Sequence, residues 1–258
     1  MLLTIDVGNT QTVMGVFRGE ELIQHWRVST EHERTADELA LIIQGFLLLE
    51  GMSFSREITG VAISSVVPRV TQTLREMTTR YFHFDPVVVG PGIKTGVPIL
   101  IDNPREVGAD RITNAVGALH LYEGPIVVVD FGTATTFDAI SAKGEYLGGA
   151  IAPGIEVSTA ALAGAGAQLR SIELIRPRSV IGKSTVESLQ SGVIFGFAGQ
   201  VDGLVGRIID EMGGKAEVVA TGGLAPAVIS ECTCIDHHEP WLTLLGLRLI
   251  FERNTPAT

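Results

Sequence analysis

Two similar stretches of sequence decide the fold: Leu2-Leu3-Thr4-Ile5-Asp6-Val7-Gly8-Asn9-Thr10 and, near the middle of the chain, Ile126-Val127-Val128-Val129-Asp130-Phe131-Gly132-Thr133. In each, an apolar run typical of a buried strand ends in Asp-x-Gly and a turn that contains Thr. Such a turn can aim backbone amides and a hydroxyl group at phosphate oxygens. A carboxylate at the strand end can hold a divalent cation that bridges phosphates. One copy alone is equally well an ordinary hairpin turn, but two copies predict two phosphate loops that face each other.

The segments around the two loops also repeat. After the first loop we expect strands over 12–17 and 22–28, a helix over 35–49, a strand over 61–67, a helix from Pro68 and a strand over 86–89. After the second we expect strands over 135–140 and 145–147, helices over 155–164 and 186–212, a strand over 216–220, a helix after Gly223, a strand over 232–235 and a helix from Pro240. The repeat predicts an α/β fold of two duplicated domains, residues 1–117 and 118–258. Each would be a mixed sheet flanked by helices, with a ligand cleft between them.

Composition restricts the class of partner. The chain has 258 residues and a formal net charge of -10. A surface that binds nucleic acid or an anionic membrane needs clustered Lys and Arg, so the acidic balance argues against both. The N-terminus lacks a basic segment, and no uncharged apolar span is long enough to cross a bilayer. A soluble cytoplasmic protein is therefore expected.

Two further segments carry candidate site residues. Thr221-Gly222-Gly223 follows an expected strand, where paired glycines would let a nucleobase or ribose approach the backbone, although such a junction is also common loop geometry. Gly108-Ala109-Asp110-Arg111 ends an irregular segment and leads into an expected helix. Asp110 would then lie in the first helical turn. Taken alone, these residues favour an acid that offsets the helix dipole over a catalytic carboxylate.

In their order along the chain, these four motifs resemble those of type III pantothenate kinases, members of the acetate and sugar kinase, Hsp70 and actin superfamily. The resemblance spans nearly the whole chain. It implies two ribonuclease H-like (actin-like ATPase) domains. It also implies ATP-dependent phosphorylation of pantothenate to 4'-phosphopantothenate, the first step of coenzyme A biosynthesis.

The resemblance also implies roles for individual residues. Asp110 would be the general base that takes the proton from the primary hydroxyl of pantothenate as that oxygen attacks the γ-phosphate. ATP contacts are implied at Asp6, Val7, Gly8, Asn9, Thr10, Gln11, Thr12, Val13, Thr133, Gly222 and Gly223. Pantothenate contacts are implied at Gly108, Ala109, Asp110, Arg111 and Thr185, the last often completed across a homodimer. Asp6 would lie at the magnesium end of ATP, and Asp130 matches a position that coordinates a monovalent cation, potassium or ammonium.

Several alternatives stay open at this point. Ile101 stands where family members usually carry a tyrosine that helps wall the pantothenate pocket, and isoleucine cannot donate a hydrogen bond. Thr185 could instead be a helix N-cap, a role that Ser184 would fill equally well. Cys232 and Cys234, with His237 and His238 nearby, are either a metal cluster or, more simply, same-face strand residues.

Two other functions compete with a pantothenate kinase. The first is a kinase of the same superfamily that acts on another small hydroxyl compound, because the two phosphate loops are generic. The second is a non-enzymatic ATP-dependent switch or regulator, since the same clamp can drive domain closure without transferring phosphate. Chain length argues against the switch, because such relatives carry inserted subdomains for their partners.

Overall fold

The computed structural model describes residues 1–165 and 172–255. Contacts divide the chain into two compact units. Unit 1 comprises Met1–Gly96, Asn103–Gly117 and the chain from Leu242 onward; unit 2 comprises Val97–Asp102 and Ala118–Trp241. Each unit holds one sheet.

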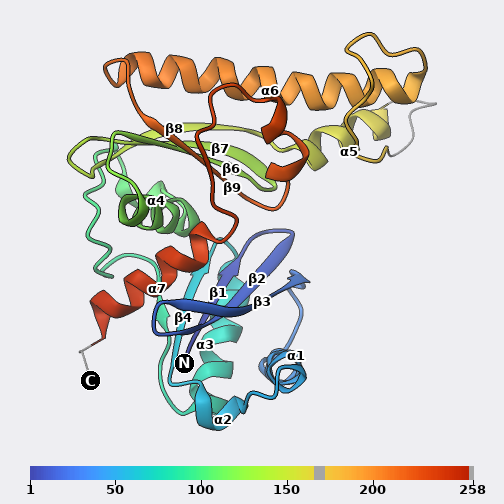
Figure 1. Cartoon of the computed structure of the whole chain (residues 1–258). Coiled ribbons are helices and arrows are strands. Elements are labelled where there is room, and N and C mark those ends of the chain that lie inside the picture. Colours follow the sequence, from blue (N-terminus) through green and yellow to red (C-terminus); the bar gives the residue numbers. More distant parts are fainter. Residues whose placement is uncertain (166–171, 256–258) are drawn as a thin grey trace. The chain divides into compact units, whose positions relative to one another are not determined.

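The sheet of unit 1 has five strands in the order β3-β2-β1-β4-β5 (Figure 1). They are β1 (Leu2–Val7), β2 (Gln11–Arg18), β3 (Glu21–Ser29), β4 (Gly60–Ser65) and β5 (Val87–Val88). Strand β2 runs antiparallel to both β1 and β3, whereas β4 runs parallel to β1 and β5. Strands β1 and β4 are mostly apolar and largely buried, as expected for strands covered on both faces.

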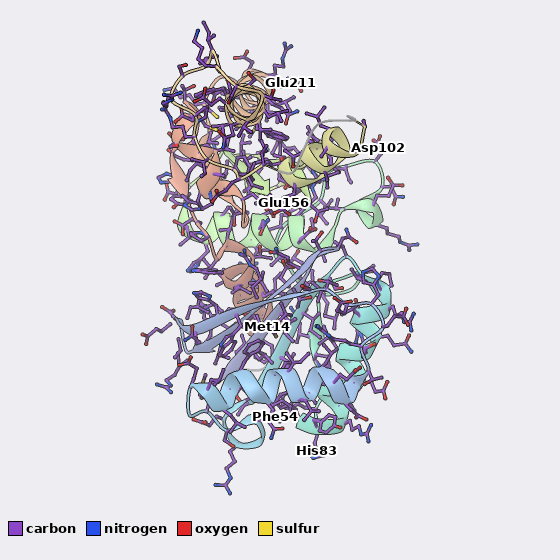
Figure 2. All side chains as sticks on the ribbon, turned by 90° about the vertical axis from the view of Figure 1, so that its right-hand side faces the viewer. Met14, Phe54, His83, Asp102, Glu156 and Glu211 are labelled. Atoms are coloured by element: carbon purple, nitrogen blue, oxygen red, sulfur yellow. The ribbon has the colours of Figure 1, made fainter. Side chains whose placement is uncertain are left out.

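Helices cover both faces of this sheet. On one face lie α1 (Ala36–Leu49) and α3 (Pro68–Phe82), with the short α2 (Phe54–Glu57) between them in sequence. Met14 of β2 points toward α1 (Figure 2). On the other face, α7 (Leu242–Asn254) packs on β1 and β4. It does so closely, since a Cβ atom added at Gly15 would lie 2.8 Å from Leu244 Cδ1.

The helix ends follow local sequence signals. Thr35 and Glu38 form a capping box that begins α1, in which the Thr35 side chain accepts from the Glu38 amide and the Glu38 side chain accepts from the Thr35 amide. Pro68 begins α3, where its missing N–H costs nothing. A 3₁₀ turn, η1 (Pro104–Glu106), precedes α4 (Ala109–Leu121), which starts in unit 1 and ends in unit 2.

The sheet of unit 2 has the order β10-β9-β6-β7-β8. Its strands are β6 (Ile126–Phe131), β7 (Ala134–Ile140), β8 (Tyr146–Pro153), β9 (Glu217–Thr221) and β10 (His237–His238). Here β7 is antiparallel to β6 and β8, and β9 is parallel to β6 and β10. Strand order and directions thus match those of unit 1, and the predicted duplication of a mixed sheet is confirmed. The division at residues 117 and 118 stays a prediction.

Helices α5 (Ile155–Ala165) and α6 (Thr185–Glu211) lie between β8 and β9 in sequence, and α6 covers one face of the sheet (Figure 1). The buried residues of α6 that join the core are Val193, Ile194, Ala198, Val201 and Val205. Among the described helices, α6 alone has the length and apolar composition to span a membrane. Core helices of soluble proteins pass the same test, so this finding is weak evidence for a membrane.

Two sequence predictions in unit 2 were wrong. The helix expected after Gly223 is replaced by two 3₁₀ turns, η2 (Ala225–Ala227) and η3 (Ile229–Glu231). No strand forms over 232–235 in this described segment; the strand there is the shorter β10. The cause is a distant side chain, because the Asp202 carboxylate accepts hydrogen bonds from the amides of Thr233 and Cys234.

The two cysteines are structural. Burial raises the pKa of Cys232 to about 12 and raises that of Cys234 further, and the carboxylate of Asp202 acts in the same direction. Such thiols stay protonated and poorly reactive. Within residues 1–165 and 172–255, no group of three His, Cys, Asp or Glu side chains is placed to hold a metal ion.

Candidate active site

The first loop closes between β1 and β2. Val7 pairs with Thr12 at the end of the ladder, and the Gly8 amide donates to the Gln11 carbonyl oxygen over 3.0 Å. A Cβ atom at Gly8 would lie 3.1 Å from that same oxygen, so the turn favours glycine. Asn9 and Thr10 at the tip are exposed. The tip is therefore accessible from solvent, and its role as a phosphate loop stays a prediction.

Asp6 has a neighbour that sequence reasoning missed. It pairs with Val13 on one side and with Ser64 of β4 on the other, so Asp6 and Ser64 share a face of the sheet. Ser64 is fully buried, and its hydroxyl oxygen has no hydrogen-bond partner among the described residues. A buried hydroxyl is costly unless something satisfies it. The Ser64 hydroxyl places a second oxygen atom, able to bind a cation, beside the Asp6 carboxylate.

Asp110 lies in the first turn of α4, where the Arg111 amide donates to its Oδ1 over 2.8 Å. Burial raises its pKa above the ordinary value for aspartate, while the hydrogen bond and charge of Arg111 oppose the rise. Gly108 leaves the space that this carboxylate fills, because a Cβ atom at residue 108 would collide with Asp110 Oδ1. Within unit 1 the structure thus brings Gly108, Asp110 and Arg111 together.

The second loop is packed against Gly222. Gly222 has φ of +93°, and a Cβ atom there would lie 2.5 Å from Asp130 Oδ1 and 2.6 Å from the Phe131 amide nitrogen. Only glycine fits both the conformation and the space. The Leu224 amide, just beyond Gly223, donates to the Phe131 carbonyl oxygen over 3.2 Å. Unit 2 therefore brings Asp130 and the Gly222-Gly223 pair into contact.

Comparisons with known proteins show the family of the chain. A family model described as type III pantothenate kinase matches residues 2–207. Relatives named type III pantothenate kinase from Streptomyces griseus, Thermobifida fusca and Moorella thermoacetica are 62%, 58% and 57% identical to the chain. These alignments cover 98% to 99% of this chain and 98% to 100% of the relatives. The chain belongs to the type III pantothenate kinase family.

Solved structures show the same fold at low sequence identity. A Campylobacter jejuni protein titled a putative Baf family transcriptional activator has a TM-score of 0.61 at 18% identity and covers 98% of each chain. A Clostridium difficile activator of 2-hydroxyisocaproyl-CoA dehydratase has a TM-score of 0.58 at 13% identity and covers 97% of this chain and 93% of its own. The family model and the relatives confirm the predicted family and the kinase class, and the solved structures confirm the predicted fold.

In this kinase, the neighbours of Asp130 in the sheet carry side-chain oxygen atoms that could bind a cation. It pairs with Thr136 of β7 and Thr221 of β9, whose side chains share its face of the sheet. Asp138, two residues further along β7, is fully buried and accepts a hydrogen bond from the Tyr146 hydroxyl over 2.6 Å. Carboxylate and hydroxyl oxygens are ligands that hard cations prefer.

Ile101 and Thr185, whose roles the sequence left open, both lie in unit 2. Ile101 is half-buried, and its Cγ2 lies 3.4 Å from the position of a Cβ atom at Gly148 of β8. Ser184 caps α6 by accepting from the Glu187 amide over 3.2 Å, so Thr185 is the first helical residue and is exposed. The N-cap alternative for Thr185 was therefore wrong, and a role for it in substrate binding remains a prediction.

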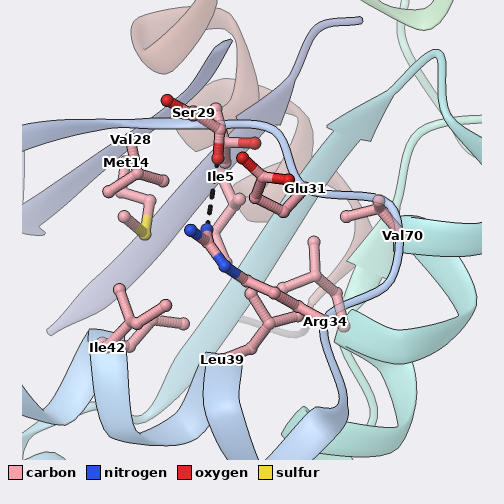
Figure 3. Close-up of a pocket in the computed structure, with 12 residues that line it drawn as sticks. Ile5, Met14, Val28, Ser29, Glu31, Arg34, Leu39, Ile42 and Val70 are labelled. Atoms are coloured by element: carbon pink, nitrogen blue, oxygen red, sulfur yellow. Dashed lines mark hydrogen bonds between the residues drawn. The ribbon is translucent and has the colours of Figure 1, made fainter. Parts of the chain in front are cut away.

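A small cavity lies beside the first loop of the kinase (Figure 3). Its volume is about 20 Å³, enough for one water molecule and far too small for a nucleotide or pantothenate. Its floor is apolar, and Arg34 closes the rim by donating from Nη1 to the Ser29 carbonyl oxygen over 3.2 Å. Residues of β3 and of the segment after it line the cavity together with Leu39 and Ile43 of α1.

Proposed function

We propose that the chain transfers the γ-phosphoryl group of ATP to the primary hydroxyl of pantothenate and releases 4'-phosphopantothenate, the first step of coenzyme A biosynthesis. The observation that carries this proposal is the identity of 57% to 62% to relatives named type III pantothenate kinase over nearly the whole chain. Asp110, half-buried at the start of α4, supports it.

In the proposed mechanism, the Asp110 carboxylate accepts the proton of the pantothenate hydroxyl as that oxygen attacks the γ-phosphorus and the bond to the β-γ bridging oxygen breaks. Its raised pKa makes the carboxylate a better base than an exposed aspartate would be. The Arg111 amide fixes one carboxylate oxygen, so the other can face the substrate. Gly108, Ala109 and Arg111 would then bind pantothenate around that base.

ATP is proposed to bind through both loops. The amides and hydroxyls of residues 6–13 would bind phosphate oxygens, Thr133 would add a second contact, and Gly222 and Gly223 would let adenosine approach the backbone. Phosphoryl transfer depends chiefly on positioning and charge neutralisation, which such backbone donors supply. ADP would leave from the same contacts.

Two cations would assist. Mg²⁺ is usually held by one or two carboxylates, water and substrate phosphates, and Asp6 beside the buried Ser64 hydroxyl fits that need. A monovalent cation, potassium or ammonium, would be held by Asp130 with the neighbouring hydroxyls of Thr136 and Thr221. Both ions would neutralise phosphate charge.

The active form is proposed to be a homodimer formed through α6. Its exposed face carries glycines at intervals of four and three residues: Gly192, Gly196, Gly199, Gly203 and Gly206. None of these glycines has another atom within 4 Å of an added Cβ, among the described residues. Exposed Val180 and Ile181 precede the same helix, and exposed Val186 lies in its first turn, next to Thr185. A second copy packed there would cover this surface and complete the substrate contact of Thr185. The dimer would be soluble and cytoplasmic.

The test is a coupled assay with the purified protein. We expect ATP-dependent phosphorylation of pantothenate, identified by mass, that requires Mg²⁺ and is stimulated by potassium or ammonium. Ile101 and the generic loops make a panel of other hydroxyl compounds the necessary comparison. Phosphorylation of a sugar but not of pantothenate would contradict the proposal, as would ATP hydrolysis without a phosphorylated product.

A further inference from the structure

Thr30, the first residue after β3, makes three polar contacts around the first loop. Its amide donates to the Thr10 carbonyl oxygen over 2.9 Å, and its hydroxyl donates to the Gly8 carbonyl oxygen over 2.8 Å. The same hydroxyl lies 2.9 Å from the Thr12 hydroxyl. Thr30 thus contacts both ends and the tip of the loop from a distance of about twenty residues in sequence.

The second unit repeats this arrangement at Gly154, the first residue after β8. The Gly154 amide donates to the Thr133 carbonyl oxygen over 3.1 Å, as the Thr30 amide does to that of Thr10. The strand registers agree as well, because Gln11 pairs with Ser29 in unit 1 and Ala134 pairs with Pro153 in unit 2. In each unit, therefore, the residue that follows the third strand binds the carbonyl of the loop threonine.

The two positions hold their loops by different chemistry. Gly154 is buried, and a Cβ atom there would collide with the Thr133 carbonyl and lie 2.6 Å from the Gly132 carbonyl oxygen. In unit 2 the contact thus depends on close backbone packing. Thr30 is only half-buried and supplies a hydroxyl in place of packing. In unit 1 the contact depends on side-chain hydrogen bonds.

The surroundings of Thr30 give these hydrogen bonds particular weight. Ser29, Glu31 and Arg34 of the segment around Thr30 line the small cavity (Figure 3). The segment is also held by the exposed ion pair between Glu33 and Arg69 of α3, and by the internal hydrogen bond from Arg34 to the Ser29 carbonyl oxygen. Little apolar packing would replace the hydroxyl of Thr30 if it were removed.

We infer that Thr30 and Gly154 are positioning residues that fix the two phosphate loops in the conformation that binds ATP. Neither needs to touch the nucleotide. Thr30 orients the peptide groups of residues 8–10 by engaging their carbonyl oxygens, so that the amides at the tip stay directed outward. This inference rests on the proposed assignment of residues 6–13 to ATP binding.

The test replaces the hydroxyl without changing the shape of the side chain. Thr30→Val should lower kcat/KM for ATP about tenfold, because one hydrogen bond to Gly8 is lost and the loop loosens. At saturating ATP, kcat/KM for pantothenate should change less than about threefold, since Asp110 is untouched. Thr30→Ser should restore ATP use to within about threefold of wild type. Direct titration with a non-hydrolysable ATP analogue should follow the same order.

Thr73→Val is the matched control. Its hydroxyl also donates to a carbonyl, that of Arg69 over 3.1 Å, but it lies on the exposed surface of α3. We expect wild-type kinetics from it. If Thr30→Val binds ATP as wild type does, or if the Ser variant is as impaired as the Val variant, the inference is wrong. Equal losses for ATP and pantothenate would also overturn it.

Thr10→Ala separates this failure from a failure of the proposed loop. If Thr10→Ala weakens ATP binding and Thr30→Val does not, the loop assignment stands and only the role of Thr30 falls. If neither variant affects ATP, residues 6–13 are not the phosphate loop, and the inference falls with that assignment.

Discussion

Asp110 illustrates how a single residue is both costly and useful. Its carboxylate is buried in the first turn of α4, and the space for it exists because residue 108 lacks a side chain. Desolvation raises its pKa, which means that the folded protein binds this proton more tightly than the unfolded chain does. Stability from this group is therefore lost as pH rises from the unfolded pKa through the folded one. Above that window the protein carries the full cost of a buried charge.

We predict that Asp110→Asn separates activity from stability. Asparagine keeps the acceptor for the Arg111 amide but cannot take a proton, so kcat should fall by about 10² to 10⁴. At neutral pH the variant should melt no lower than wild type, because the buried charge is gone. Steady-state kinetics and thermal melts check both parts.

The acid limb of the pH–rate profile provides the control for this prediction. In wild type, kcat should decline on acidification with an apparent pKa above the ordinary value near 4 for aspartate. The variant should lack that limb. An unchanged kcat, or the same acid limb in both proteins, would show that another group is the base.

At the scale of elements, Gly154 directly after β8 is a sensitive point of unit 2. We predict that Gly154→Ala weakens ATP binding at least about tenfold and lowers the melting temperature, because the new methyl group collides with the loop carbonyls. Gly164→Ala is the matched control in α5, since nothing lies within 4 Å of its added Cβ among the described residues. Helix propensity makes that substitution neutral or slightly stabilising. Equal behaviour of the two variants in ATP titration would contradict the prediction.

Which elements could be predicted from sequence follows from how local their causes are. Helices α1 and α3 were predicted because Thr35 with Glu38, and Pro68, mark their starts within a few residues. The strand over 232–235 was mispredicted because Asp202, about thirty residues away, holds the backbone at Thr233 and Cys234. The residues of the candidate site divide in the same way, into those that local motifs reveal and those that depend on distant contacts.

Motif residues such as Asp6, Asp130 and Gly222 were found because their signatures are contiguous. Thr30 and Ser64 were not, because Thr30 reaches the first loop through hydrogen bonds across more than twenty residues of sequence and Ser64 lies beside Asp6 only through sheet pairing. The internal repeat could have revealed Thr30 and Gly154, since each is the first residue after the third strand of its half.

For the whole molecule, the glycine face of α6 makes opposite predictions for a dimer and for a monomer. Leucine has a higher helix propensity than glycine by up to about 1 kcal/mol, so Gly199→Leu should stabilise a helix whose face meets only water. In the proposed dimer the same side chain would prevent close approach of the two copies. We therefore predict that Gly199→Leu is monomeric by sedimentation velocity and has a raised KM for pantothenate, because Thr185 of the partner no longer completes the site. Gly45→Leu, at an exposed glycine within α1, is the matched control and should leave both quantities unchanged. If Gly199→Leu has the same oligomeric state as wild type by sedimentation velocity and a higher melting temperature, the dimer interface lies elsewhere.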